Sequence, residues 1–251
     1  MQNVIDHIRT FKDRFSLEDN EYSRLIAKKR EWEPSKVSPF EPGSISEARL
    51  DCLKRLTALA LRLELQVGDW VTSALPTVPD SARYALCHNA QDEITHDLAF
   101  NNMAEGLGGI PEKYLQEAEY MRQMVQEMNH PLMMTAYLEL SVFFVTLTMM
   151  REYGNHSIKL LMGDIARDEA AHVRLHWHLS DQMGLKPTAQ MDKARQEIVT
   201  WLYPTPGRTQ QKWLDNSDKL ASTRTAPDLT WTKAALAVAH FEVPNESIAR
   251  Y

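Results

Sequence analysis

The chain has 251 residues, a net charge of −6, 43% hydrophobic residues and 25% charged residues. This composition is that of an ordinary globular protein, and the acidic balance disfavours nucleic acid or an acidic membrane as a partner. Two isolated cysteines, Cys52 and Cys87, are expected to be buried thiols, and the lack of a Cys-x-x-C pair disfavours a zinc ribbon, a rubredoxin-type site and a dithiol redox motif. The charged, amphipathic beginning of the sequence lacks the apolar run of a secretory signal, so we expect a cytoplasmic protein.

Helical patterns dominate the first half of the chain. Residues 31–44 hold three prolines and are expected to form an extended connector. A long amphipathic helix is predicted over 46–74, where helix-start residues precede apolar residues at helical spacing and a proline-containing turn follows. A second long helix is expected over about 80–106 and ends in a glycine-rich turn. A shorter polar helix begins at Pro111.

The second half of the chain opens with a strongly apolar helix, predicted from Pro131 to about residue 152. Its length would suffice to cross a membrane, but Glu139 lies at its middle, where a charge in hydrocarbon is costly. We therefore expect no membrane span and a helix buried on all sides in a protein core. A further long helix should end at Met183. Another helix is predicted over residues 188–204, and weaker helical patterns follow near 208–220 and 230–241.

The expected fold class is all-α, because no run of alternating polar and apolar residues predicts a strand. Four long helices are expected to pack as a bundle, with the shorter helix after Pro111 in the crossover between the second and the third. The whole chain, 1–251, is interpreted as one domain with a core of about 46–183 and shorter accessory helices in 1–45 and 188–251. We expect these accessory segments to cover the bundle ends or to form a contact in a homodimer.

The sequence contains the pattern Asp-Glu-x-x-His twice, at 92–96 and at 168–172. Glutamate and histidine three residues apart lie on one face of a helix, so each pair is able to hold one metal ion. Glu93 with His96, and Glu169 with His172, lie on the apolar faces of their predicted helices. The repeated pattern therefore predicts a buried metal site.

The other two long helices each place one glutamate on an apolar face. Glu64 precedes Glu93 by 29 residues and Glu139 precedes Glu169 by 30, so the chain contains one arrangement twice. Four buried carboxylates would repel one another, and two metal cations would remove that repulsion. Di-iron and di-manganese bundles carry one glutamate on each of two helices and Glu-x-x-His on each of the other two.

Asp92 and Asp168 each precede a glutamate of the repeated pattern. A metal-bound histidine commonly donates its second ring N–H to a carboxylate. We therefore expect Asp92 to pair with His172, and Asp168 with His96, each across the bundle.

These residues resemble the ferritin-like di-iron carboxylate superfamily over roughly residues 46–183. The resemblance implies a ferritin-like four-helix bundle with a catalytic site of two Fe ions, although the same ligand types suit a Mn/Fe pair. The ligands that it implies are Glu64, Glu93, His96, Glu139, Glu169 and His172. It also implies a non-haem oxidase or oxygenase, of the monooxygenase type, that uses O2 and an external electron donor on a small, apolar organic substrate. The expected pocket residues are Phe100, Phe143 and Tyr137.

Two alternatives from the same superfamily remain. Ribonucleotide reductase small subunits generate a radical on a tyrosine that commonly lies one turn after the first histidine, where this chain has Phe100. Ferritin-like iron storage and rubrerythrin-like peroxide handling use a similar bundle. However, ferritins usually lack the second histidine, and two lone cysteines do not build rubrerythrin's cysteine-ligated iron domain. Packing alone also explains the three pocket residues. His176, one turn beyond His172, is either a structural hydrogen-bonded histidine or a residue that supports the metal ligands.

Overall fold

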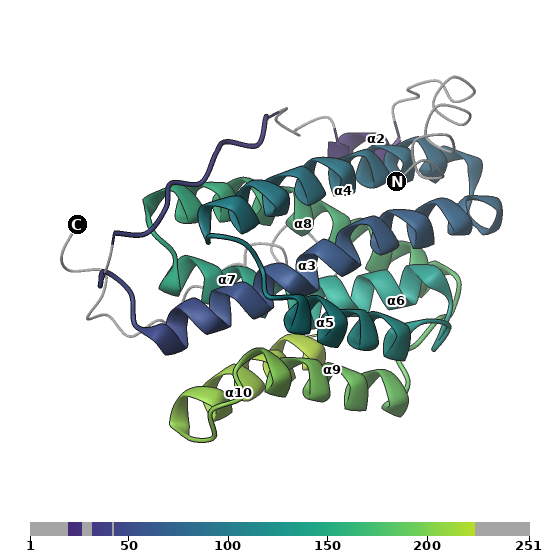
Figure 1. Ribbon diagram of the computed structural model, residues 1–251. Helices are drawn as coiled ribbons and strands as arrows, with labels where there is room; N and C mark the ends of the chain where they lie inside the picture. Colours follow the sequence, from purple (N-terminus) through teal and green to yellow (C-terminus); the bar gives the residue numbers. More distant parts are fainter. Residues whose placement is uncertain (1–19, 27–31, 42, 224–251) are drawn as a thin grey trace.

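The protein is described here from a computed structural model, over residues 20–26, 32–41 and 43–223 (Figure 1). Within these ranges the chain forms helices and loops but no strand, so the predicted all-α class is confirmed. The helical pattern predicted over 230–241 lies outside the described residues. The interpretation of 1–251 as one domain stays a prediction.

Four helical segments pack against one another as the core of the molecule. Helices α3 (Glu47–Ala74) and α4 (Asp80–Gly106) are joined by the short 3-10 helix η1 (Leu75–Thr77). The third segment is α6 (Pro131–Leu138), the π-helix η2 (Glu139–Phe143) and α7 (Phe144–Tyr153), and the fourth is α8 (His156–Gln182). Each predicted boundary of these segments lies within a few residues of the observed one.

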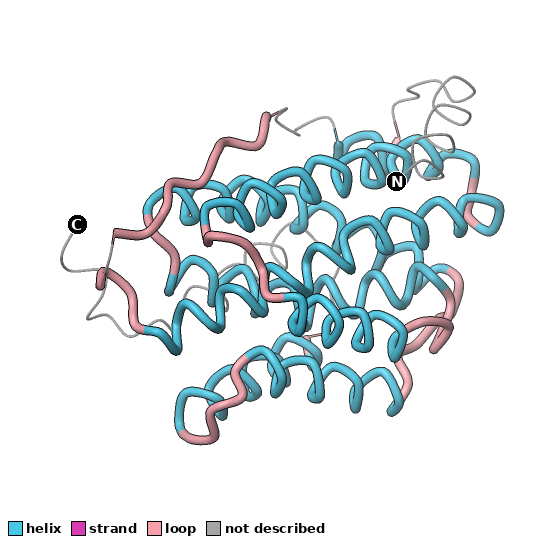
Figure 2. The backbone as a smooth tube through the Cα atoms, in the orientation of Figure 1, coloured by secondary structure: helices cyan, strands magenta, loops and turns pink. Residues whose placement is uncertain are grey.

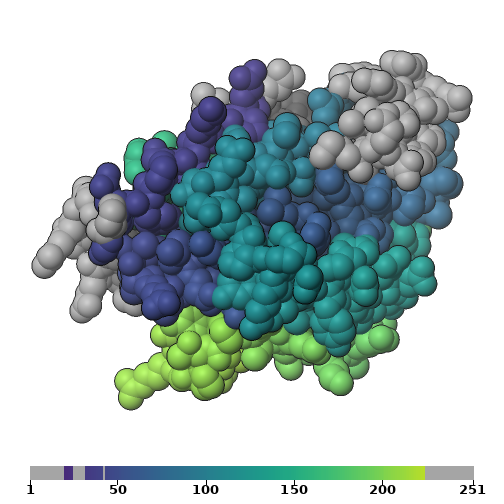
Figure 3. Space-filling model, in the orientation of Figure 1, coloured from purple at the N-terminus to yellow at the C-terminus, as the bar shows by residue number. Residues whose placement is uncertain are grey.

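Shorter helices surround this core. They are α2 (Glu21–Ile26), α5 (Glu112–Val125), α9 (Ala189–Leu202) and α10 (Arg208–Ser222). Helix α5 packs on α3 and α9, and the side chains of α9 and α10 form a layer along the lower edge in Figure 3. Accessory helices are therefore present both before and after the four core segments in the sequence, as expected.

Local chemistry explains where the helices begin. Asn155 precedes α8, and its side-chain oxygen accepts the Ile158 N–H at 3.1 Å. Thr188 caps α9 in the same way, accepting the N–H of Met191 at 3.3 Å. Ser46 is the N-cap of α3, but its side chain makes no cap hydrogen bond with the described residues.

The apolar third segment is interrupted by a wider turn that sequence analysis did not predict. Pro131–Tyr153 is long and apolar enough to cross a membrane by length and composition, but 94% of its most apolar window is buried inside the protein. The residues Glu139–Phe143 form a π-helix, a local widening that is frequent at functional sites. Both predicted buried thiols, Cys52 and Cys87, are indeed buried.

A buried arginine links α9 and α10 to the π-helix through hydrogen bonds. Arg195 is 1% exposed, forms an ion pair with Asp192 at 3.0 Å and donates to the Ser217 hydroxyl at 2.7 Å. Ser217 in turn donates to the backbone carbonyl of Ser141 at 2.7 Å. A π-helix leaves carbonyls poorly satisfied within the helix, so this bond stabilises the wider turn.

The connector between α2 and α3 lies along α4 (Figure 2). Asn102 of α4 donates to the carbonyl of Pro34 at 3.2 Å, and Asn155 donates to that of Ser38 at 2.7 Å. Gly106 allows the close approach, because a Cβ atom there would lie 2.6 Å from Val37 Cγ1 and 2.7 Å from the Val37 oxygen. The predicted connector is thus confirmed over 32–41, which hold neither helix nor strand, whereas residues 43 and 44 form a turn and a bend.

We expect Gly106→Ala to lower the free energy of unfolding by about 1–3 kcal/mol, because the added methyl group must push the connector away from α4. Urea unfolding followed by circular dichroism measures this change. Gly163→Ala is the matched control, since a Cβ atom placed there in α8 would meet no described atom within 4 Å beyond its chain neighbours and the backbone of its own helix. It should stabilise the helix by about 0.5–1 kcal/mol. A Gly106 variant as stable as the wild type would contradict the close packing.

Candidate metal centre

Six carboxylate and imidazole side chains meet at the centre of the four core segments. Each is at most 3% exposed, although such groups are usually found at the surface. They come from all four core segments: Glu64 from α3, Glu93 and His96 from α4, Glu139 from η2, and Glu169 and His172 from α8. The structure therefore brings together every predicted ligand.

One half of the cluster surrounds His96. Its Nδ1 atom lies 3.4 Å from Glu64 Oε2, 3.3 Å from Glu93 Oε2 and 3.2 Å from Glu169 Oε1. One ligand atom of each of these four residues lies within 4.8 Å of the others. This spacing is that of side chains around a single cation.

The other half surrounds His172. Its Nδ1 atom lies 3.1 Å from Glu93 Oε1, 3.7 Å from Glu169 Oε2 and 3.9 Å from Glu139 Oε1. Glu93, Glu139 and His172 form the second group able to hold a metal ion. Glu93 and Glu169 thus each turn one oxygen toward His96 and the other toward His172, whereas Glu64 and Glu139 lie at opposite ends.

The donor atoms fit a metal better than they fit hydrogen bonds. Both Glu64 oxygens, Glu139 Oε1 and the Nδ1 atoms of His96 and His172 are buried without a hydrogen-bond partner among the described residues. Several of the N–O distances are short enough for hydrogen bonds, yet these atoms form none in the described part of the chain, and one ligand atom of each residue in a group lies within 4.8 Å of the others. Buried polar atoms without partners are costly, and a cation in each group would satisfy them.

The charges of the cluster support the same conclusion. Without a metal, burial raises the pKa of Glu64 and Glu139 well above the usual value for glutamate. Burial opposes protonation of His172, but Glu93 and Glu169 outweigh it and raise the His172 pKa to about 10. Protons therefore neutralise the metal-free cluster. Four carboxylates with neutral imidazoles would instead carry four negative charges, which two divalent cations balance.

Both predicted aspartate–histidine contacts are present. His172 Nε2 lies 3.0 Å from Asp92 Oδ2, and His96 Nε2 lies 3.4 Å from Asp168 Oδ2. The crossed pairing follows from the opposite directions of α4 and α8. An aspartate at each Nε2 favours the N–H there and leaves both Nδ1 atoms facing the cluster as metal donors.

Trp32, in the connector, reaches the same aspartate and was missed by the sequence analysis. Its indole N–H donates to Asp168 Oδ2 at 2.7 Å, and its ring stacks on that of His96 with 6.1 Å between centroids. Trp32 lies 64 residues before His96 in the chain, so no local pattern links them.

Two further polar residues hold glutamates of the cluster. Asn89 donates to Glu93 Oε1 at 2.7 Å, and His176 Nδ1 lies 2.8 Å from Glu139 Oε2. Burial lowers the pKa of His176 to about 3, so its ring is neutral. Asn89 lies one turn before Glu93 on the same helical face, a spacing that sequence analysis could have used.

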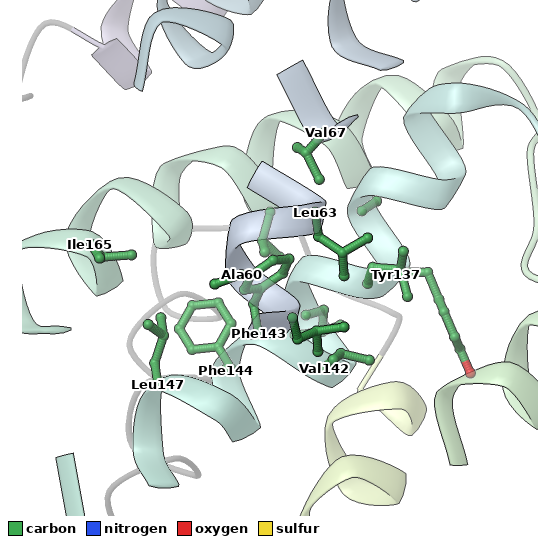
Figure 4. Close-up of a cluster of buried hydrophobic side chains, with 14 of the residues drawn as sticks. Ala60, Leu63, Val67, Tyr137, Val142, Phe143, Phe144, Leu147 and Ile165 are labelled. Carbon is green, nitrogen blue, oxygen red and sulfur yellow. The ribbon is translucent and has the colours of Figure 1, made fainter. Parts of the chain in front are cut away.

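The three expected pocket residues are all buried but do not all face the cluster. Phe143 packs with Phe144 beside Ala60 and Leu63, whereas Tyr137 points away from them (Figure 4). The Tyr137 hydroxyl donates to Asp192 Oδ1 at 2.6 Å. This placement favours the packing role for Tyr137. Phe100 is fully buried in α4, one turn after His96, and its pocket role stays a prediction, as does that of Phe143.

No model of a known protein family matches the chain, and no curated protein matches it. What the fold and the site define is an all-helical protein with buried glutamate–histidine clusters able to hold a metal. This architecture is compatible with a ferritin-like fold.

Proposed function

We propose that this chain is a ferritin-like non-haem di-iron oxidase or oxygenase. The observation that carries the proposal is the position of Glu93 and Glu169, each with one oxygen toward His96 and one toward His172. Carboxylates placed in this way suit a pair of ions that share ligands. Glu64 and Glu139 would each bind one ion at the ends.

Two iron ions, when bound, supply the redox chemistry that activates O2 for the oxidation of a small organic substrate. The protein's own residues would set the conditions. Asp92 and Asp168 orient the imidazoles and keep their protons on Nε2, away from the ions. Phe100 and Phe143 exclude water and favour an apolar substrate. Carboxylate and imidazole ligands suit iron, and a Mn/Fe pair as well.

A radical-generating subunit is a second candidate, and Trp32 is the observation that favours it. Its partly buried indole donates to Asp168, which contacts His96, so an easily oxidised ring is linked by hydrogen bonds to the proposed site. The same link would serve an oxygenase as an entry for electrons from an external donor. An organic radical signal after O2 exposure, detected by electron paramagnetic resonance, distinguishes this candidate from the oxygenase.

The test loads the metal-free protein with Fe(II) under anaerobic conditions and then measures bound iron and O2 uptake. We expect about two irons per chain, one for each group of ligands, and O2 uptake that continues only when a reductant is supplied. Accumulation of many irons per chain would indicate storage instead. Failure to bind iron, or Fe(II)-loaded protein that takes up no O2, would contradict the proposal.

A further inference from the structure

The two glutamates at the ends of the cluster are held differently. Glu139 Oε2 lies 2.8 Å from Nδ1 of His176, which is fully buried, whereas Glu139 Oε1 has no hydrogen-bond partner within the described chain. That second oxygen lies 3.9 Å from His172 Nδ1. Neither oxygen of Glu64, its counterpart, has a hydrogen-bond partner among described residues. Glu139 and Glu64 therefore differ in how many of their oxygens are free to bind a metal ion.

We propose that His176 is a positioning residue for Glu139, donating its Nδ1–H to Oε2 so that Oε1 alone is presented to the metal beside His172. Glu64 is left free to bind the other ion through one or both of its oxygens. This inference rests on the proposed metal-binding function and deepens it, because it makes the two metal positions chemically different.

Two features of the fold support this role. His176 follows His172 by one turn on α8, so both rings lie on the face that meets η2, with 6.2 Å between their centroids. Glu139 is the first residue of the π-helix, which Ser217 fixes from α10 through the Ser141 carbonyl. The π-helix that begins at Glu139 is thus held by a hydrogen bond from α10, and the Glu139 side chain by one from α8.

The ligand atoms beside Glu139 are also less tightly grouped. Four residues place a ligand atom within 4.8 Å of one another around His96, whereas among the described residues only Glu93, Glu139 and His172 do so in the other group, although Glu169 Oε2 lies 3.7 Å from His172 Nδ1. We therefore expect the position beside His96 to bind its ion more tightly, and the position beside His172 to depend strongly on how Glu139 is held.

The experiment titrates the full-length metal-free protein with Co(II) and follows the visible absorption of the bound ion. Wild type should bind two ions in two separable steps. His176→Phe keeps a ring of similar size but removes the N–H, and it should weaken the second step about 10–100-fold, the usual effect of removing a hydrogen bond to a metal ligand. The first step should change by less than about twofold, because the hydrogen bond that His176 makes to the cluster goes to Glu139, which belongs to the other position.

His178→Phe is the matched control. His178 lies two residues further along α8, is 30% exposed and pairs with Glu21 and Gln182 rather than with the cluster. Its titration should match that of wild type. Gln and Leu at position 176 have similar sizes, but only Gln has an N–H group that can donate to Glu139. The His176→Gln variant should therefore bind the second ion more tightly than the His176→Leu variant. This contrast tests the proposal even where the Phe variant loses helical content.

Three outcomes would overturn the inference. If both the Phe and the Leu variant bound two ions with the affinities of the wild type, the hydrogen bond would not position Glu139. An equal loss of both steps would show that His176 only supports the fold. If the wild-type protein bound neither Co(II) nor Fe(II), the proposed function and this inference would both be overturned. That result is distinguishable from the other two because it is seen in the wild type, without any substitution.

Discussion

Replacing Glu93 by alanine should abolish the binding of both metal ions. Glu93 belongs to both groups of ligands, with Oε2 3.3 Å from His96 Nδ1 and Oε1 3.1 Å from His172 Nδ1. The substitution removes an anionic ligand from each position at once, so the loss of affinity should exceed the roughly 10–100-fold effect of losing a residue that only orients a ligand. Metal analysis after desalting should fall from about two ions per chain to nearly none.

The matched control is Glu105→Ala, which removes an exposed carboxylate from the same helix. It should bind as much metal as wild type. The fold of the Glu93 variant should survive, because a buried carboxylate is costly in the metal-free state and alanine is a strong helix former. Circular dichroism without metal checks this point. A Glu93 variant that still binds two ions would contradict the shared-ligand geometry, and Glu169→Ala provides the same test from α8.

The metal-free protein should lose stability as the pH rises from about 6.5 to about 10. The pKa of His172 is raised from 6.5 to about 10 by the carboxylates around it. A raised pKa means that the folded state binds the proton more tightly than the unfolded state. The stabilisation is complete below pH 6.5 and is lost as the pH approaches 10, at a rate of at most about 1.4 kcal/mol per pH unit for one group.

Glu64 and Glu139 act in the same direction at lower pH. Burial raises the pKa of each above the usual value of 4.5, so their protons also stabilise the metal-free fold, and this contribution decreases above pH 4.5. Binding of metal replaces these protons and should release them. The loaded protein should therefore be more stable at pH 8 than the metal-free protein, and this difference should shrink toward acid pH as protons compete for the ligands.

Urea unfolding at several pH values, with a chelator or with saturating metal, measures both trends. A pH indicator in weak buffer records the released protons. His172→Gln should flatten the decrease in stability of the metal-free protein between pH 6.5 and 10, whereas exposed His156→Gln should leave it unchanged. Metal-free stability that rises through this window would contradict the charge balance described for the cluster.

The sequence alone predicted the helices and the six candidate ligands because both depend on local spacing. Apolar residues at helical intervals, together with prolines and glycines at the ends, identified the four core segments to within a few residues. Glu93 with His96, and Glu169 with His172, are neighbours on a helical face whatever the fold. The crossed contacts of Asp92 and Asp168 then followed from two antiparallel helices that carry the same motif.

Tertiary structure decided the remaining features, because they depend on how one segment is rotated against another. The contact of Trp32 with Asp168 joins residues 136 positions apart, and the pairing of His176 with Glu139 requires the face of α8 to meet the third segment. The π-helix at Glu139 is stabilised by Ser217 of α10, so helical propensity gave no sign of it. Tyr137 faces α9 instead of the cluster, since its hydroxyl group has its partner there.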